Sequence, residues 1–145
     1  MDYRLYGDTY YIRLDRGNEI IASILDVCEA EGIRSATFSG IGGCSDAEIM
    51  VFSPERGEFD PEPVQGVLEL VTLTGNVISD DDGLHYHAHA LFAYRDGDEA
   101  RIAAGHLKDS TVLYTAEIEL RPVLGGVIGR ELNEETGTGF WKFPE

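Results

Sequence analysis

The chain has 145 residues, of which 43% are hydrophobic, and this is enough for one domain with a core of its own. Its net charge of -16, from 27 acidic and 11 basic residues, repels phosphate and argues against direct DNA binding. It has no apolar run of about 18 residues, the length of a membrane-spanning helix, and no signal-peptide pattern. We therefore expect a single domain over residues 1–145, no membrane association, a cytoplasmic location and reduced thiols at both cysteines.

The first part of the sequence predicts a strand followed by a helix. Alternating apolar residues predict one strand over residues 3–14. Apolar residues spaced three and four apart then predict an amphipathic helix that ends near Glu31. Asn18 is the expected N-cap, and Gly32 suits the left-handed position after the helix, where Ile33 would pack back on the last turn.

A glycine-rich segment follows a short predicted strand at residues 34–39. Residues 40–43 predict a tight turn that leads into a strand over residues 46–52, and Cys44, which follows the glycines, is expected to be a turn residue. A phosphate-binding loop is the alternative, but such a loop precedes a helix N-terminus, and here a strand pattern follows. Close packing of the backbone explains these glycines better.

The middle of the chain predicts a loop and a central strand. Residues 54–63 contain three prolines among charged residues and predict a surface loop. Residues 64–79 are apolar on both faces, which is typical of a central strand. We expect the acidic residues 80–83 to form a solvated turn, because they lack the ligand spacing of a calcium loop.

The last part of the chain predicts more strands. After a strand that carries histidines, residues 95–99 predict a hairpin turn and residues 100–107 a returning strand. Residues 108–110 predict another turn before an edge or half-buried strand at 111–121. The tail from residue 123 ends in aromatic residues, which we expect to pack on the domain or on a neighbouring subunit. The whole pattern predicts an α+β fold, with a mostly antiparallel or mixed β-sheet flanked by one main N-terminal helix.

All four histidines lie between residues 85 and 106. Side chains alternate along a strand, so His85, His87 and His89 share one face. If the hairpin loop has four residues, His89 lies opposite His106, whereas a two-residue loop at Asp96-Gly97 places His87 opposite His106. Both registers bring His87, His89 and His106 together, because opposed and diagonal side chains are within reach. A register shifted by one residue would instead place His106 on the other face.

Three neutral imidazoles on a rigid sheet form a suitable site for zinc, with a fourth position left for water or a small-molecule ligand. Imidazole also binds nickel, copper and iron, so another divalent transition metal fits the same residues. The alternative is that the histidines make hydrogen bonds in a sheet interface and hold no metal.

Glu69 is the one charged residue in an otherwise apolar strand. An inward-facing carboxylate has to be paired, protonated or bound to a cation, so Glu69 is a candidate general base or a hydrogen-bond partner of a metal ligand. Alternatively, it lies on a solvent-facing or inter-subunit surface and pairs with an arginine. We find no Ser-His-Asp set, reactive Cys-His pair or nucleotide fingerprint.

Several motifs in order resemble the plant and prokaryote conserved (PPC) domain family. The resemblance extends from about Tyr3 to Glu119 and therefore includes nearly the whole chain. The motifs are Ser39-Gly40-Ile41-Gly42, Gly66-Val67-Leu68-Glu69-Leu70, Leu73-Thr74-Gly75-Asn76, His87-Ala88-His89 and Gly105-His106-Leu107.

The resemblance implies a mostly antiparallel sheet flanked by a helix, and a homotrimer. It also implies that His87, His89 and His106 match the family's histidine positions, which look like a zinc site in some members. His85 lies outside these positions, and Ala104-Gly105 stands where the family often has two glycines. The family is often labelled DNA-binding, but in plant members an AT-hook makes the DNA contact, and this chain lacks such a hook.

The leading hypothesis is therefore a homotrimeric PPC-domain protein of unassigned biochemical role that binds zinc or a similar metal. A second hypothesis is a metal-dependent lyase or hydrolase that acts on a small carboxylate substrate, with Glu69 transferring protons. A distant likeness to acetolactate decarboxylase, which uses three histidines and zinc, supports it only by analogy. A third hypothesis is an assembly module in protein or DNA-bound complexes without a metal.

Overall fold

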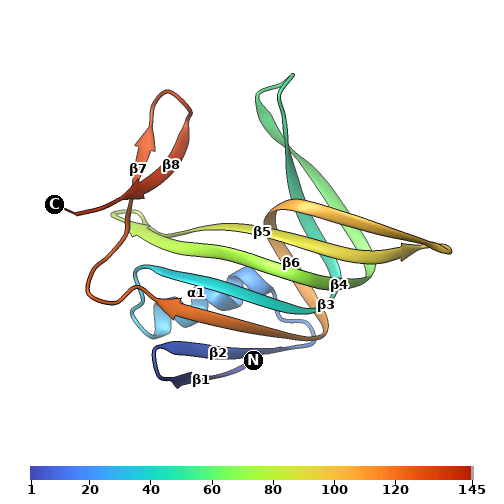
Figure 1. Cartoon of the computed structure of the whole chain (residues 1–145), viewed down its shortest axis with the longest axis horizontal. Coiled ribbons are helices and arrows are strands. Elements are labelled where there is room, and N and C mark those ends of the chain that lie inside the picture. The colour runs from blue at the N-terminus through green and yellow to red at the C-terminus, as the bar shows by residue number, and fades with distance from the viewer. Residues whose placement is uncertain (145) are drawn as a thin grey trace.

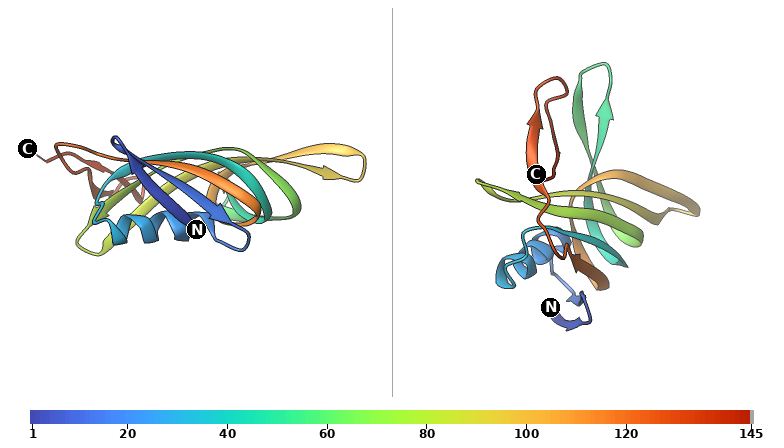
Figure 2. Two further views of the ribbon diagram at one scale, coloured as in Figure 1. Left: turned by 90° about the horizontal axis from the view of Figure 1, so that it is seen from below. Right: turned by 60° about the vertical axis from the view of Figure 1, so that its left-hand side comes forward.

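One helix and eight strands make up the fold in the computed structural model, which describes residues 1–144 (Figure 1). The strands form a single sheet, and α1 lies along one of its faces (Figure 2). The prediction of an α+β fold with a mostly antiparallel sheet and an N-terminal helix is confirmed at this level, although the helix is a minor part. The elements are β1 (Asp2–Tyr6), β2 (Thr9–Asp15), α1 (Ile20–Ala30), β3 (Ala36–Ser53), β4 (Glu58–Asp80), β5 (Gly83–Asp96), β6 (Glu99–Pro122), β7 (Gly129–Asn133) and β8 (Thr138–Lys142).

The four long strands form a closed circuit of antiparallel neighbours. β3 pairs with β4 and β6, and β5 also pairs with β4 and β6. Each of these strands buries a large apolar side chain in the one hydrophobic core, namely Ile49, Leu68, Phe92 and Leu107. Closure of the circuit leaves few free strand edges and holds β5 and β6 rigidly side by side.

Helix α1 adds a second layer to this core. Its apolar face, which includes Ile20, Ile24 and Val27, is almost fully buried. None of the helices in the described part of the chain is long and apolar enough to cross a membrane.

The predicted turn at residues 40–43 is wrong, because β3 continues through it. The register between β3 and β4 shifts between Gly40 and Gly42 because Val71 is an extra residue in β4, so the bulge lies in the partner strand and β3 makes no turn. A Cβ atom on Gly40 or Gly42 would lie 2.7 or 2.8 Å from a backbone oxygen of β6. Close packing of the backbone therefore explains these glycines, as expected. Cys44, predicted in the turn, is fully buried within β3.

The bounds of several other predicted strands and turns also differ from those in the structure. The predicted opening strand is the hairpin of β1 and β2, which turns where Gly7 has a φ of 64°. Most of the predicted loop at residues 54–63 belongs to the β3–β4 hairpin. The predicted turn at 108–110 is a bulge in β6, since Lys108 is the extra residue between two pairs of the β3–β6 ladder. Of the two alternatives for the strand at 111–121, the edge position is wrong, because the strand pairs with β2 and β3, and the half-buried strand is confirmed, because alternate residues such as Ala116 and Ile118 are buried.

The N-terminus of α1 is capped from another strand. Glu19 is the N-cap residue but its side chain makes no capping bond, and Asn18, the predicted cap, instead accepts a hydrogen bond from the backbone N–H of Asp15. The Asp109 carboxylate accepts hydrogen bonds from the backbone N–H groups of Ile21 at 2.9 Å and Ala22 at 3.2 Å. The predicted end of the helix is confirmed by Gly32, with a φ of 67°, and by the Ile33 N–H bond to a helix carbonyl.

Replacement of Asp109 by alanine is expected to lower the free energy of unfolding by about 1–2 kcal/mol. The reason is that two partly buried N–H groups of α1 lose their acceptor. Urea unfolding measures the change, and Asp98→Ala in the exposed β5–β6 turn serves as the matched control. If both variants unfold at the same urea concentration, the capping role is excluded.

The C-terminal tail forms a hairpin that packs on the domain. β7 and β8 pair with each other and join β4 through a parallel bridge between Ser79 and Gly129. The Trp141 indole donates a hydrogen bond of 3.4 Å to the side-chain oxygen of Asn76. Trp141 thus contacts the domain, but the aromatic side chains of the tail remain 45–66% exposed, so packing of the whole aromatic ending stays a prediction. Glu145 lies outside the described residues.

Candidate metal centre

Strand β5 separates its side chains into a buried and an exposed set. Ala88 and Ala90 face the core, whereas His87 and His89 lie on the opposite, exposed face. The next strand brings the third histidine, because His89 pairs directly with His106. Of the two predicted registers, the one that pairs these two histidines is confirmed. The other is wrong, since the hairpin turns after the pair Asp96 and Glu99.

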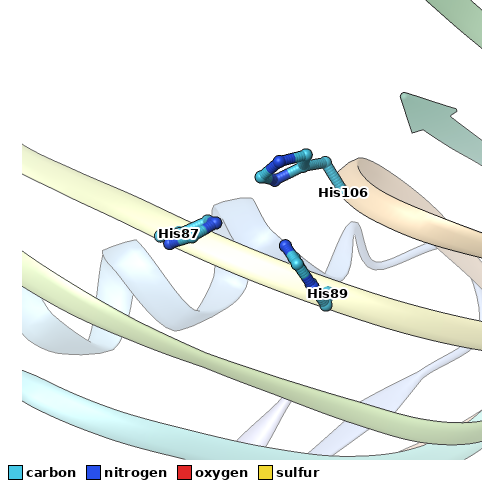
Figure 3. A group of neighbouring side chains, drawn as sticks. All are labelled: His87, His89 and His106. Atoms are coloured by element: carbon cyan, nitrogen blue, oxygen red, sulfur yellow. The ribbon is translucent and has the colours of Figure 1, made fainter. Parts of the chain in front are cut away.

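The three imidazoles converge on one point beside the sheet (Figure 3). Their ring centroids lie 5.0 Å apart for His87 and His89, 4.9 Å for His87 and His106, and 4.4 Å for His89 and His106. One nitrogen from each ring lies within 4.8 Å of the others. A tetrahedral zinc ion with bonds of about 2.0–2.1 Å needs nitrogens about 3.3 Å apart, so small rotations of the side chains would complete the site.

The surroundings favour the neutral form of two of the imidazoles, those of His87 and His106. Burial lowers the pKa of His87 below its usual value of 6.5, and the neighbouring His89 lowers it further. Burial also lowers the pKa of His106, with smaller contributions from His89 and His87. A neutral imidazole offers a nitrogen lone pair, so the folded chain presents these rings in the state that a metal ion requires.

These shifts predict how the stability of the metal-free protein depends on pH. The unfolded chain protonates its histidines near pH 6.5, whereas folded His87 and His106 do so at lower pH. The free energy of unfolding should therefore fall as the pH drops below about 6.5, with no change from these groups well above that pH. Urea unfolding measures the slope, and the double variant His87→Gln/His106→Gln should show a shallower one. An equal slope in the wild type and the double variant would contradict the assignment of this pH dependence to His87 and His106.

The backbone around His106 is tightly packed. A Cβ atom on Gly105 would lie 2.8 Å from the carbonyl oxygen of Met50, so glycine allows β3 to approach β6 beside the histidine. Ala104, where the family often has another glycine, is exposed, and its methyl group is therefore accommodated. The Phe59 ring meets His106 edge-on at a centroid distance of 4.4 Å. These contacts restrict the orientation of His106.

His85 lies on the same strand but takes part in a different interaction. Its Nε2 atom lies 2.8 Å from the carboxylate of Asp80, which is also 3.5 Å from the guanidinium of Arg130. The hydrogen bond from His85 is the main reason why the pKa of Asp80 is lowered. His85 is therefore outside the three-histidine cluster and helps to hold the C-terminal hairpin.

Glu69 lies apart from the three histidines within one chain. It is exposed on β4, opposite Ala93 of β5, and Ala93 is four residues beyond His89. Four residues of strand correspond to about 13 Å. Val67 and Val71 on either side are 61% and 49% exposed, so Glu69 belongs to an outward, largely apolar surface.

A groove of about 500 Å³ begins at His87 and His89. It extends over the exposed face of the sheet and includes Arg121 of β6 and Trp141 of β8. Sequence reasoning missed both residues, since Trp141 and Asn76 are 65 positions apart and share no local pattern.

Comparisons with known proteins agree with the fold and the motifs. The sequence profile of the Plants and Prokaryotes Conserved (PCC) domain matches residues 1–123. No curated protein sequence matches the chain.

Three solved structures are similar over nearly their whole length. A plant- and prokaryote-conserved (PPC) protein from Pyrococcus horikoshii is 32% identical, with a TM-score of 0.81 over 99% of this chain and 96% of that chain. A metal-containing protein from Archaeoglobus fulgidus is 29% identical, with a TM-score of 0.81 over 97% of this chain and 96% of that chain. A candidate DNA-binding protein from Bacteroides thetaiotaomicron is 23% identical and shares the fold, with a TM-score of 0.89 over 98% of this chain and 96% of that chain. The profile match over residues 1–123, together with the 32% identity to the Pyrococcus horikoshii protein, shows that the chain belongs to the Plants and Prokaryotes Conserved domain family, the PPC family expected from its motifs.

Proposed function

We propose that this PPC-domain protein binds one divalent transition metal ion per chain, zinc by preference, through His87, His89 and His106. The observation that carries the proposal is the convergence of three imidazole nitrogens within 4.8 Å of one another on two paired strands. The lowered pKa of His87 and His106 and the metal-containing archaeal relative support it. Zinc is preferred because it commonly takes three histidines and leaves one position open.

The open position supports a catalytic role as a second candidate. His87 and His89 are exposed toward the groove, so a small-molecule ligand or a water can reach the metal. A bound metal would polarise a carbonyl group or activate that water, which suits a lyase or hydrolase acting on a small carboxylate. Glu69 would transfer protons in this scheme only if a neighbouring subunit brings it to a metal site.

We further propose that the protein assembles as a homotrimer. Support comes from an exposed apolar patch of four side chains on the adjacent strands β3, β4 and β6, and monomers seldom leave such residues together in water. The patch consists of Ile41, Val67, Val71 and Tyr114, which are 54%, 61%, 49% and 66% exposed. An assembly module without metal is the remaining alternative, and the net charge of -16 argues against direct contact with DNA. A cytoplasmic location stays a prediction.

Elemental analysis of protein purified without chelators tests the metal proposal. We expect about one ion per chain, since the three ligands come from the same chain. Cobalt substitution gives an independent measurement, because a tetrahedral cobalt site has characteristic visible absorption. Less than about a tenth of an ion per chain would exclude the proposed site.

A further inference from the structure

The exposed face of the sheet beside the three histidines carries two rows of polar side chains. Residues that pair across a sheet point to the same face, so each row can be followed through the registers of β5, β4, β3 and β6. The first row is His87, Asn76, Thr37 and Arg121, and the second is His89, Thr74, Ser39 and Glu119.

These two rows form the floor of the groove that begins at the histidines. A row that crosses three strand spacings of about 4.8 Å places the Cα atoms of Arg121 and His87 about 14 Å apart. The groove thus has the proposed metal site at one end, and at the other the Arg121 guanidinium with the Glu119 carboxylate beside it. Hydroxyl and amide groups lie between them.

Arg121 is available to a ligand. Its Nε atom donates a hydrogen bond of 3.3 Å to the Thr9 hydroxyl and lies 4.0 Å from Asp8. Within residues 1–144, its two Nη groups make no hydrogen bond or ion pair, and its side chain is 60% exposed. These two groups can hold a carboxylate in bidentate geometry.

The C-terminal hairpin supplies a wall of the groove. Trp141 lies against the floor, where its indole N–H bonds to Asn76, and Arg130 fixes the hairpin through Asp80. This hairpin lies beyond residues 1–123, the part that matches the family profile. An indole ring offers a broad apolar surface on which a carbon chain or a planar group can pack.

We infer that the groove binds a linear small molecule with a carboxylate at each end. One carboxylate occupies the open position of the metal, the other pairs with Arg121, and the carbon chain packs against Trp141. The attraction at the Arg121 end comes from two parallel hydrogen bonds donated by its Nη groups and not from net charge, since Glu119 and Asp8 lie close to it. This inference rests on the proposed metal site and names the class of ligand that the site accepts.

Tryptophan fluorescence provides a direct test, because Trp141 is the only tryptophan of the chain. Zinc-loaded protein is titrated with adipate and succinate, and with hexanoate, which has a single carboxylate. We expect a saturable change with at least one diacid and at least about tenfold weaker binding of hexanoate. Arg121→Gln should weaken diacid binding at least about tenfold with unchanged zinc content, whereas Arg95→Gln in the distant β5–β6 hairpin should bind as the wild type does.

The outcomes separate this inference from the proposed function. A protein with one metal ion per chain that responds to neither diacid would overturn the inference alone. The inference would also be overturned if the zinc-loaded and the metal-free protein bound the diacid with equal affinity. The same holds if Arg121→Gln bound the diacid as tightly as the wild type does. Absence of metal would overturn both. If Arg121→Gln fails to fold, Arg121→Lys, which keeps the charge but loses the bidentate geometry, should still show weaker binding.

Discussion

Replacement of His106 by alanine is expected to reduce the metal content from about one ion to less than about a tenth of an ion per chain. The two ligands that remain, His87 and His89, both come from β5, and two histidines leave half of a tetrahedral shell to solvent. We expect the affinity for the metal to fall at least about 100-fold, since loss of a group that only orients a metal ligand already lowers metal affinity by about 10–100-fold. His87→Ala should have a similar effect, and elemental analysis with competition by a chromophoric chelator measures both.

His85→Ala is the matched control for these variants. It removes the same type of side chain from the same strand, but His85 pairs with Asp80 and lies outside the cluster. The control should keep its full metal content. A comparable loss in His85→Ala and His106→Ala would show that the ligand set is wrong or that the hairpin has lost its structure, and circular dichroism separates these two explanations.

The histidine cluster could be predicted from the sequence because it depends on a simple periodicity. Side chains alternate along a strand, and both even registers of the hairpin bring His106 to the face of His87 and His89. An error in loop length therefore changes the direct partner of His106 without breaking up the cluster. The structure selects the pairing with His89.

The bulges and the groove could not be predicted in this way. A bulge adds one residue without ending the strand, so the polar segment 108–110 looks locally like a turn. The glycine-rich segment 40–43 looks like one too, although it is a continuous strand that faces a bulge in β4. Strict alternation would place Leu73 on the face of Val67 and Glu69, but the bulge at Val71 interrupts the alternation and Leu73 is buried in the core. The groove joins β8 to residues far earlier in the chain, and such contacts depend on tertiary packing rather than on local pattern.

A lysine at Val67 is expected to dissociate the proposed homotrimer. The wild type should scatter light as a species of about 48 kDa, three times the chain mass of 16.0 kDa, and Val67→Lys as a single chain at micromolar concentration. The reason is that Val67 is 61% exposed in one chain, so lysine is tolerated in the fold, whereas burial of its charge in an interface costs several kcal/mol. Leu132→Lys in β7 is the matched control, because Leu132 is also 61% exposed but lies outside the patch, and this variant should remain trimeric.

The same pair of variants tests the role of Glu69. Glu69 lies between Val67 and Val71, so a subunit that covers these valines would also cover the carboxylate and could bring it to another chain's metal site. Val67→Lys should then keep the proposed metal, since the three candidate ligands belong to one chain, but lose any activity that depends on Glu69. A trimer of unchanged mass in Val67→Lys would exclude this patch as the interface, and with it the route by which Glu69 reaches a metal.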